Sequence, residues 1–259
     1  MIFEWQAGLW QRVLDSAGRM PHALLFAGPA GGGKRHFAEA LAARVLCARP
    51  GADGHACGVC EDCLWRLAGN HPDLLRVIPE ADREPRDDAP EKPEGGKAAS
   101  RQIVIEQIRE LQQALTTGGH RGSQRVAIVD PAEAMNLYTA NALLKLLEEP
   151  TTNVLFILIS SSPKRLLPTI RSRCQTWAFP RPAGEQAARW LVERKTPDAA
   201  SLLAFAGGMP LAVRPVLRWD LAGLQVPVVG ARIGGGSWPG LHGGGQGGEG
   251  LGEHRPGRL

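Results

Sequence analysis

The chain has 259 residues, 43% hydrophobic and 22% charged, which suits a soluble globular protein and excludes a wholly disordered one. No apolar run approaches the ~20 residues of a membrane span, and the N-terminal sequence MIFEWQAGLW lacks the basic start of a signal peptide. We therefore expect a cytoplasmic protein without membrane contact. The net charge of +4 permits contact with nucleic acid but does not require it.

Short apolar runs alternate with helical patterns along most of the chain. The expected strands are residues 23–27, 73–78, 125–130, 153–160 and 175–179. The expected helices are residues 34–48, 104–116, 137–147 and 163–171. Such alternation favours an α/β fold, with a parallel sheet covered by helices on both faces. In sheets of this kind, ligands lie at the C-terminal ends of the strands.

Composition divides the chain into two folded parts and a tail. We expect an α/β domain over residues 1–180, with a charged surface insertion at 79–101, and a small helical domain over 181–219. Residues 220–259 are rich in glycine, which predicts either a flexible tail or the product of a frame error. The abrupt change in composition favours the frame error.

A glycine-rich loop follows the first expected strand. Residues 28–35 read GPAGGGKR and fit the phosphate-binding pattern G-x-x-x-x-G-K through Gly28, Gly33 and Lys34. Glycines allow backbone N–H groups to surround phosphate oxygens, and the lysine reaches the β- and γ-phosphates. The Ser or Thr that holds Mg²⁺ should come next, but Arg35 stands there instead. We predict descent from a P-loop fold, with doubtful ATP binding, and a turn that binds nothing remains the alternative.

Asp130 ends an apolar strand as the aspartate of a Walker B strand does. Pro131 follows it, at the position where an active P-loop ATPase with such a strand usually carries a glutamate that polarises the attacking water. Glu133 lies too far along the chain to be assumed equivalent. The alternative is that Asp130 only caps the following helix.

Four cysteines have the spacing of a metal site. Cys57, Cys60 and Cys63 form a C-x2-C-x2-C pattern, and Cys47 lies ten residues upstream. Four thiolates close a tetrahedral structural zinc site and leave no open position for catalysis. A 4Fe–4S cluster and unmetallated thiols are the less favoured alternatives.

The end of the sheet-forming part carries serines and arginines. Residues 160–162 are serines that could supply a sensor hydroxyl to a γ-phosphate, and Arg171 and Arg173 stand just before the last expected strand. By themselves the two arginines are equally consistent with a solvated pair.

Several of these segments together resemble the AAA+ clamp-loader family of bacterial DNA polymerase III, in particular its delta-prime subunits. The resemblance covers residues 1 to about 219, and nothing after Trp219 resembles the helical collar domain that ends the family. The segments that carry it are HALLF at 22–26, the phosphate loop, the four cysteines, GNHPD at 69–73, IVIEQIR at 103–109, ANALLKLLEEP at 140–150, SRC at 172–174 and AGGMP at 206–210.

The resemblance implies a subunit that does not hydrolyse ATP. Such a subunit assembles with tau/gamma motor subunits and a delta subunit, and the ring loads the sliding clamp on primed DNA. The arginine of the Ser-Arg-Cys triplet, Arg173 here, would act in trans at the ATP site of a neighbouring motor subunit. Any DNA-directed DNA polymerase (nucleotidyltransferase) activity would belong to the complex.

Two other functions are alternatives. An autonomous AAA+ ATPase would need Ser or Thr after Lys34 and an acid after Asp130, and the chain has neither. A zinc-stabilised nucleic-acid-binding module is compatible with the cysteines, but no stripe of aromatic and basic residues accompanies them.

Overall fold

The computed structural model describes residues 2–16, 18–83, 99–116 and 124–213. Five parallel strands form one sheet in the order β2-β3-β4-β1-β5. The strands are β1 (Ala23–Ala27), β2 (Leu74–Val77), β3 (Arg125–Val129), β4 (Val154–Ser160) and β5 (Gln175–Ala178). Every strand lies inside a range predicted from the sequence.

The sheet is buried on both faces, as its continuous apolar strands require. All residues of β1, β3 and β4 are buried. Successive side chains point to opposite faces, so Leu25 joins one hydrophobic cluster while Leu24 and Phe26 join the other. The sheet is therefore the middle layer of three.

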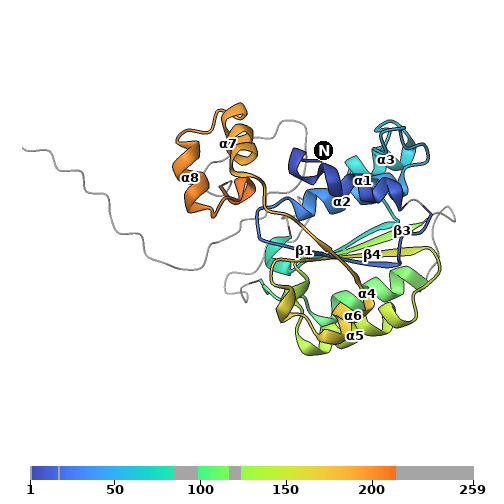
Figure 1. Cartoon of the computed structure of the whole chain (residues 1–259). Helices are drawn as coiled ribbons and strands as arrows, with labels where there is room; N and C mark the ends of the chain where they lie inside the picture. The colour runs from blue at the N-terminus through green and yellow to red at the C-terminus, as the bar shows by residue number, and fades with distance from the viewer. Residues whose placement is uncertain (1, 17, 84–98, 117–123, 214–259) are drawn as a thin grey trace, which may run out of the picture.

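Helices cover each face (Figure 1). On one side lie α4 (Ile105–Thr116), α5 (Leu137–Glu148) and α6 (Pro168–Arg173), and on the other lie α1 (Ala7–Asp15) and α2 (Lys34–Leu46). The short helix α3 (Glu61–Leu67) follows α2 along the chain and contacts it. These layers, with the phosphate loop after β1, confirm the expected α/β fold, a parallel sheet with helices on both faces.

A separate group of helices follows the sheet. It contains α7 (Gly184–Glu193), α8 (Ala199–Phe205) and the 3-10 helix Pro210–Val213, which share a small hydrophobic cluster of their own. Figure 1 shows α7 and α8 beside the α/β layers rather than in them. The division at 180/181 stays a prediction. Residues 84–98 of the predicted insertion and the predicted tail at 220–259 lie outside the described residues.

Two expected helices differ from the structure by more than one residue, for local reasons. The helix expected over 163–171 is divided into the 3-10 helix Pro163–Arg165 and α6. Pro168 opens α6 and holds Leu167 in an extended conformation with ψ of 136°, because a proline disfavours helical geometry in the residue before it. The helix expected over 34–48 ends at Leu46, since Cys47 is already extended.

Within the described ranges, no helix combines the length and the apolar character that a membrane crossing demands.

Candidate functional site

The phosphate loop connects the C-terminal end of β1 to α2, the position that P-loop proteins use. Gly33 has a φ of 89°, in the left-handed region that favours glycine. A Cβ atom there would lie 2.6 Å from Nε2 of Gln6, so only glycine fits under the N-terminal segment. The conformation of the loop therefore requires the glycine at this position.

Lys34 is bound to its own loop. Its Nζ donates to the carbonyl oxygens of Gly28 at 2.7 Å and Pro29 at 2.8 Å, and to the hydroxyl of Ser161 at 3.1 Å. A lysine ammonium has three N–H donors, so all three are engaged. Lys34 is 4% exposed, and burial lowers its pKa from 10.5 to about 8 against the opposing charges of Asp130 and Glu133.

Arg35 pairs with Asp130 across the same site. Its Nε donates to Oδ2 of Asp130, the residue directly after β3. Burial raises the pKa of Asp130, while the positive charges of Arg35 and Lys34 oppose that rise. The guanidinium thus supplies the positive charge that a Mg²⁺ ion would bring to Asp130. The 3-10 helix that follows has Pro131 at its N-cap, with no side-chain capping bond.

Glu133 also reaches this site, which the spacing along the chain did not reveal. Its Oε1 accepts a hydrogen bond of 2.9 Å from the backbone N–H of Ser161, at the end of β4. Of the three predicted serines, Ser161 is the one whose hydroxyl contacts Lys34, while Ser160 is buried and accepts from the N–H of Ser162. The acid and the hydroxyl therefore face the loop lysine together.

Other parts of the chain cover the phosphate loop. The indole Nε1 of Trp5 and Nε2 of Gln6 both donate to the carbonyl oxygen of Gly32, at 3.1 and 3.0 Å. From the other side, the N–H of Leu211 donates to the carbonyl oxygen of Gly31 at 3.3 Å. The sequence offered no signal for these contacts, because the partners are distant along the chain.

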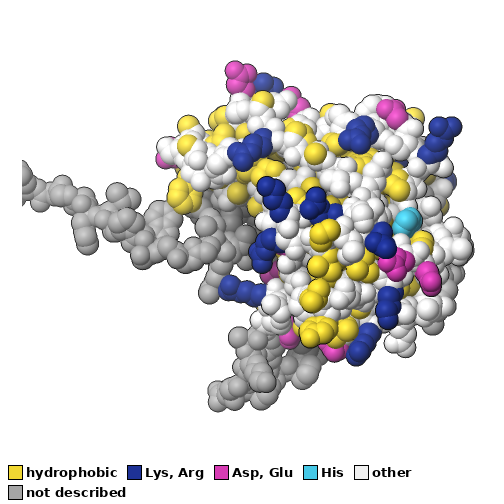
Figure 2. All heavy atoms as spheres, turned by 60° about the horizontal axis from the view of Figure 1, so that its bottom comes forward, with side chains coloured by type: hydrophobic (Ala, Val, Ile, Leu, Met, Phe, Trp, Pro, Cys, Tyr) yellow, Lys and Arg dark blue, Asp and Glu magenta, His cyan; other side chains and the backbone are white. Residues whose placement is uncertain are grey.

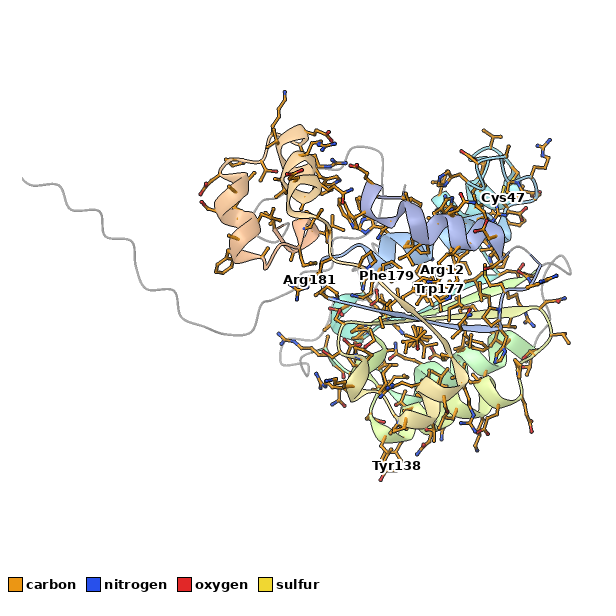
Figure 3. The ribbon with its side chains drawn as sticks, viewed as in Figure 1. Arg12, Cys47, Tyr138, Trp177, Phe179 and Arg181 are labelled. Atoms are coloured by element: carbon orange, nitrogen blue, oxygen red, sulfur yellow. The ribbon has the colours of Figure 1, made fainter. Side chains whose placement is uncertain are left out.

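The four predicted metal ligands converge. The Sγ atoms of Cys47, Cys57, Cys60 and Cys63 all lie within 4.8 Å of one another, and those of Cys47 and Cys60 are 3.9 Å apart. A zinc ion with four Zn–S bonds of ~2.3 Å spaces its sulfurs by about 3.8 Å, so the cluster fits one tetrahedral ion. A 4Fe–4S cluster fits less well, since it holds each thiolate on a different iron and so farther apart. Figure 3 places Cys47 away from α7 and α8.

The thiols of this cluster differ in acidity without an ion. Hydrogen bonds from the backbone N–H groups of Val59 and Cys60 lower the pKa of Cys57 to about 6, whereas burial raises the pKa of Cys63 to about 12. Thiolates repel one another in such a small volume, and a divalent cation would relieve that repulsion. The donor set therefore suits a metal such as zinc.

Arg173 lies at the C-terminal end of α6, remote from the chain's own phosphate loop in the fold. Its Nη2 is 2.5 Å from Oε1 of Glu148, and its Nη1 donates to the carbonyl oxygen of Thr169 at 3.1 Å. Its side chain is 36% exposed. The structure thus presents Arg173 outward rather than bringing it to Lys34 and Asp130.

The sheet order, the loop after β1 and the aspartate after β3 define an α/β protein of the P-loop class. A family model described as "DNA polymerase III, delta subunit" matches residues 7–183, and the chain belongs to this family. Among its curated relatives are delta-prime subunits of the same polymerase.

The delta-prime subunit of Pseudomonas aeruginosa is 41% identical over 218 residues, covering 82% of this chain and 60% of that protein. The Escherichia coli subunit is 32% identical over 224 residues, covering 84% and 61%. The gamma/tau subunit of Mycobacterium bovis is 37% identical over 167 residues, covering 64% of this chain and 26% of that protein. The chain spans about 60% of the length of the delta-prime relatives.

Proposed function

We propose that the chain acts as a delta-prime-type clamp-loader subunit in DNA polymerase III. Its family membership over residues 7–183 and its similarity to named delta-prime subunits support this role. The partners we propose are gamma/tau motor subunits and a delta subunit, with the sliding clamp and primed DNA bound by the complex. Because replication takes place on the bacterial chromosome, we propose the cytoplasm as its location.

We propose that the chain does not hydrolyse ATP. The observation that carries this proposal is the pairing of Arg35 with Asp130, which places a guanidinium beside the expected metal ligand. Arg35 replaces the hydroxyl that would hold Mg²⁺ and pairs with the would-be metal ligand Asp130. Pro131 supplies no carboxylate to polarise a water.

Arg173 is the residue we propose to act in trans. An arginine brought to a neighbour's γ-phosphate can raise phosphoryl-transfer rates by ~10³–10⁵ in NTPases. Arg173 is exposed at a helix end. Several Lys and Arg side chains lie on the face of the molecule that Figure 2 turns toward the viewer. Such a face favours contact with an anionic ligand.

We propose that the four cysteines hold one structural zinc ion. The ion would join the end of α2 to the start of α3, since Cys47 follows one helix and Cys60 and Cys63 begin the other. With four protein ligands it would leave no position for a substrate, so its effect would be on folding.

The first test is ATP hydrolysis by an assembled ring of motor, delta and this subunit, with clamp and primed DNA. Arg173→Ala should lower the ring's kcat by at least about tenfold without preventing assembly. Arg171→Ala is the matched control, because Arg171 is also exposed on α6. Full activity in an assembled Arg173→Ala ring would refute the role in trans, and hydrolysis by this chain alone would support an autonomous ATPase instead.

A further inference from the structure

The C-terminal ends of α5 and α6 are held in place by the hydrophobic core. Helices α5 and α6 pack together on one face of the sheet, and α5 ends at Glu148 while α6 ends at Arg173. Each end is anchored by a neighbour in the core: Leu147 is 2% exposed and Ile170 is fully buried. The backbones beneath Glu148 and Arg173 therefore cannot move apart without opening the hydrophobic core.

The side chain of Arg173 contacts both of these helices. Arg173 donates through Nη2 to Glu148 at 2.5 Å and through Nη1 to Thr169 at 3.1 Å. Within the described part of the chain it pairs with Glu148 and not with the adjacent Glu149. A guanidinium has five N–H donors, so these two contacts leave three for another ligand.

The pair has little to do with stability. Glu148 is 47% exposed and Arg173 is 36% exposed, and ion pairs in such positions add little to the free energy of unfolding. Glu148 also stands at the C-terminal end of α5, where the helix dipole disfavours a negative charge. What the contact does is restrict a long side chain to one orientation.

We infer that Glu148 is a positioning residue for Arg173: it holds the guanidinium at the end of α6 with three donors unused, ready for the phosphate of a neighbouring subunit. This inference rests on the proposed role of Arg173 in trans. Glu148 itself touches no nucleotide. Orientation of this kind matters mainly in the transition state, so its loss should lower kcat more than it changes KM.

The first arm of the test uses the chain alone. In ¹⁵N spectra of the arginine side chains, the wild type should show hindered rotation of the Arg173 guanidinium. Glu148→Gln should abolish it, and Glu149→Gln should preserve it. Free rotation in the wild type, or equal spectra for the two variants, would overturn the inference even in the absence of a ring.

The second arm uses the assembled ring. Glu148→Gln should lower kcat for ATP about threefold to tenfold and leave KM within about twofold, while Glu149→Gln changes neither. Adding Glu148→Gln to Arg173→Ala should cause no further loss. If Arg173→Ala lowers kcat and Glu148→Gln does not, or raises it, the inference fails and the proposed function stands. If Arg173→Ala has no effect, the proposed function itself fails.

Discussion

At the scale of single residues, the charged groups of the phosphate loop are bonded to other groups of the same chain. Lys34 is saturated by carbonyl and hydroxyl oxygens, and Arg35 supplies the cation that faces Asp130. The identities of these residues could be predicted from the G-x-x-x-x-G-K pattern, whose last position is altered. Their partners could not, because Ser161 and Glu133 come from other loops that only the folded sheet brings together.

The buried ammonium of Lys34 gives stability a pH dependence of known sign. Its folded-state pKa of about 8 lies below the ordinary 10.5, so between these values the unfolded chain binds more protons than the folded chain. Stability contributed by this group therefore increases as the pH rises through that window. From pH 7.5 to 9.5, wild type should gain about 2 kcal/mol in free energy of unfolding relative to Lys34→Met.

Urea denaturation at the two pH values measures this difference directly. Lys145→Met is the matched control, because Lys145 is exposed and its loss removes the same charge. A constant difference between wild type and Lys34→Met across the window would mean that Lys34 stays protonated in the folded chain.

At the scale of elements, the strands were predictable and the short helices were less so. Continuous apolar runs locate β1, β3 and β4, because both faces of a central parallel strand are buried. The edge strands β2 and β5 also lie inside predicted ranges, although some of their residues are exposed. The sequence pattern does not predict helix α1, whose N-cap residue Gln6 makes no side-chain capping bond. The cysteine spacing predicted a convergent cluster, and the ends of α2 and α3 do bring the four sulfurs together.

The cysteine cluster, of which Cys60 and Cys63 lie at the start of α3, should bind one metal ion. Wild type should contain about one zinc per chain by elemental analysis, and Cys60→Ser should lose most of it and unfold at a lower temperature. Cys174→Ala is the control, because Cys174 is buried in the core near α6, away from the cluster. If wild-type protein purified without chelators contains no metal, the four cysteines do not form a metal site.

At the scale of the whole molecule, the phosphate loop is a junction between three parts. The N-terminal segment contacts it through Trp5 and Gln6, and the helical part contacts it through Leu211. Trp5 also lies edge-on to Trp190 of α7, with ring centroids 6.1 Å apart. A loop that in active P-loop proteins binds a nucleotide here joins the sheet to the helical part. Such a connection is consistent with the proposed role of a subunit that does not hydrolyse ATP itself.

Gly31 tests this junction, because it lies where the loop meets the helical part. A Cβ atom at Gly31 would lie 2.7 Å from both the backbone nitrogen and the Cβ of Ala212, and the residue has a φ of +78°. Gly69 has the same φ of +78° but nothing within 4 Å of its Cβ position. Gly69→Ala therefore measures the cost of left-handed backbone alone, and Gly31→Ala measures that cost plus the clash.

We expect Gly31→Ala to lower the free energy of unfolding by about 2 kcal/mol more than Gly69→Ala does. Because the clash is with the backbone of Ala212, relief requires residues 209–213 to move off the loop. Limited proteolysis should then cut the helical part, from α7 onward, faster in Gly31→Ala than in wild type. Gly69→Ala should be cut at the wild-type rate. Equal stability and equal cleavage in the two variants would show that the helical part does not rest on the phosphate loop in solution, and the loop would then be open to a ligand from that side.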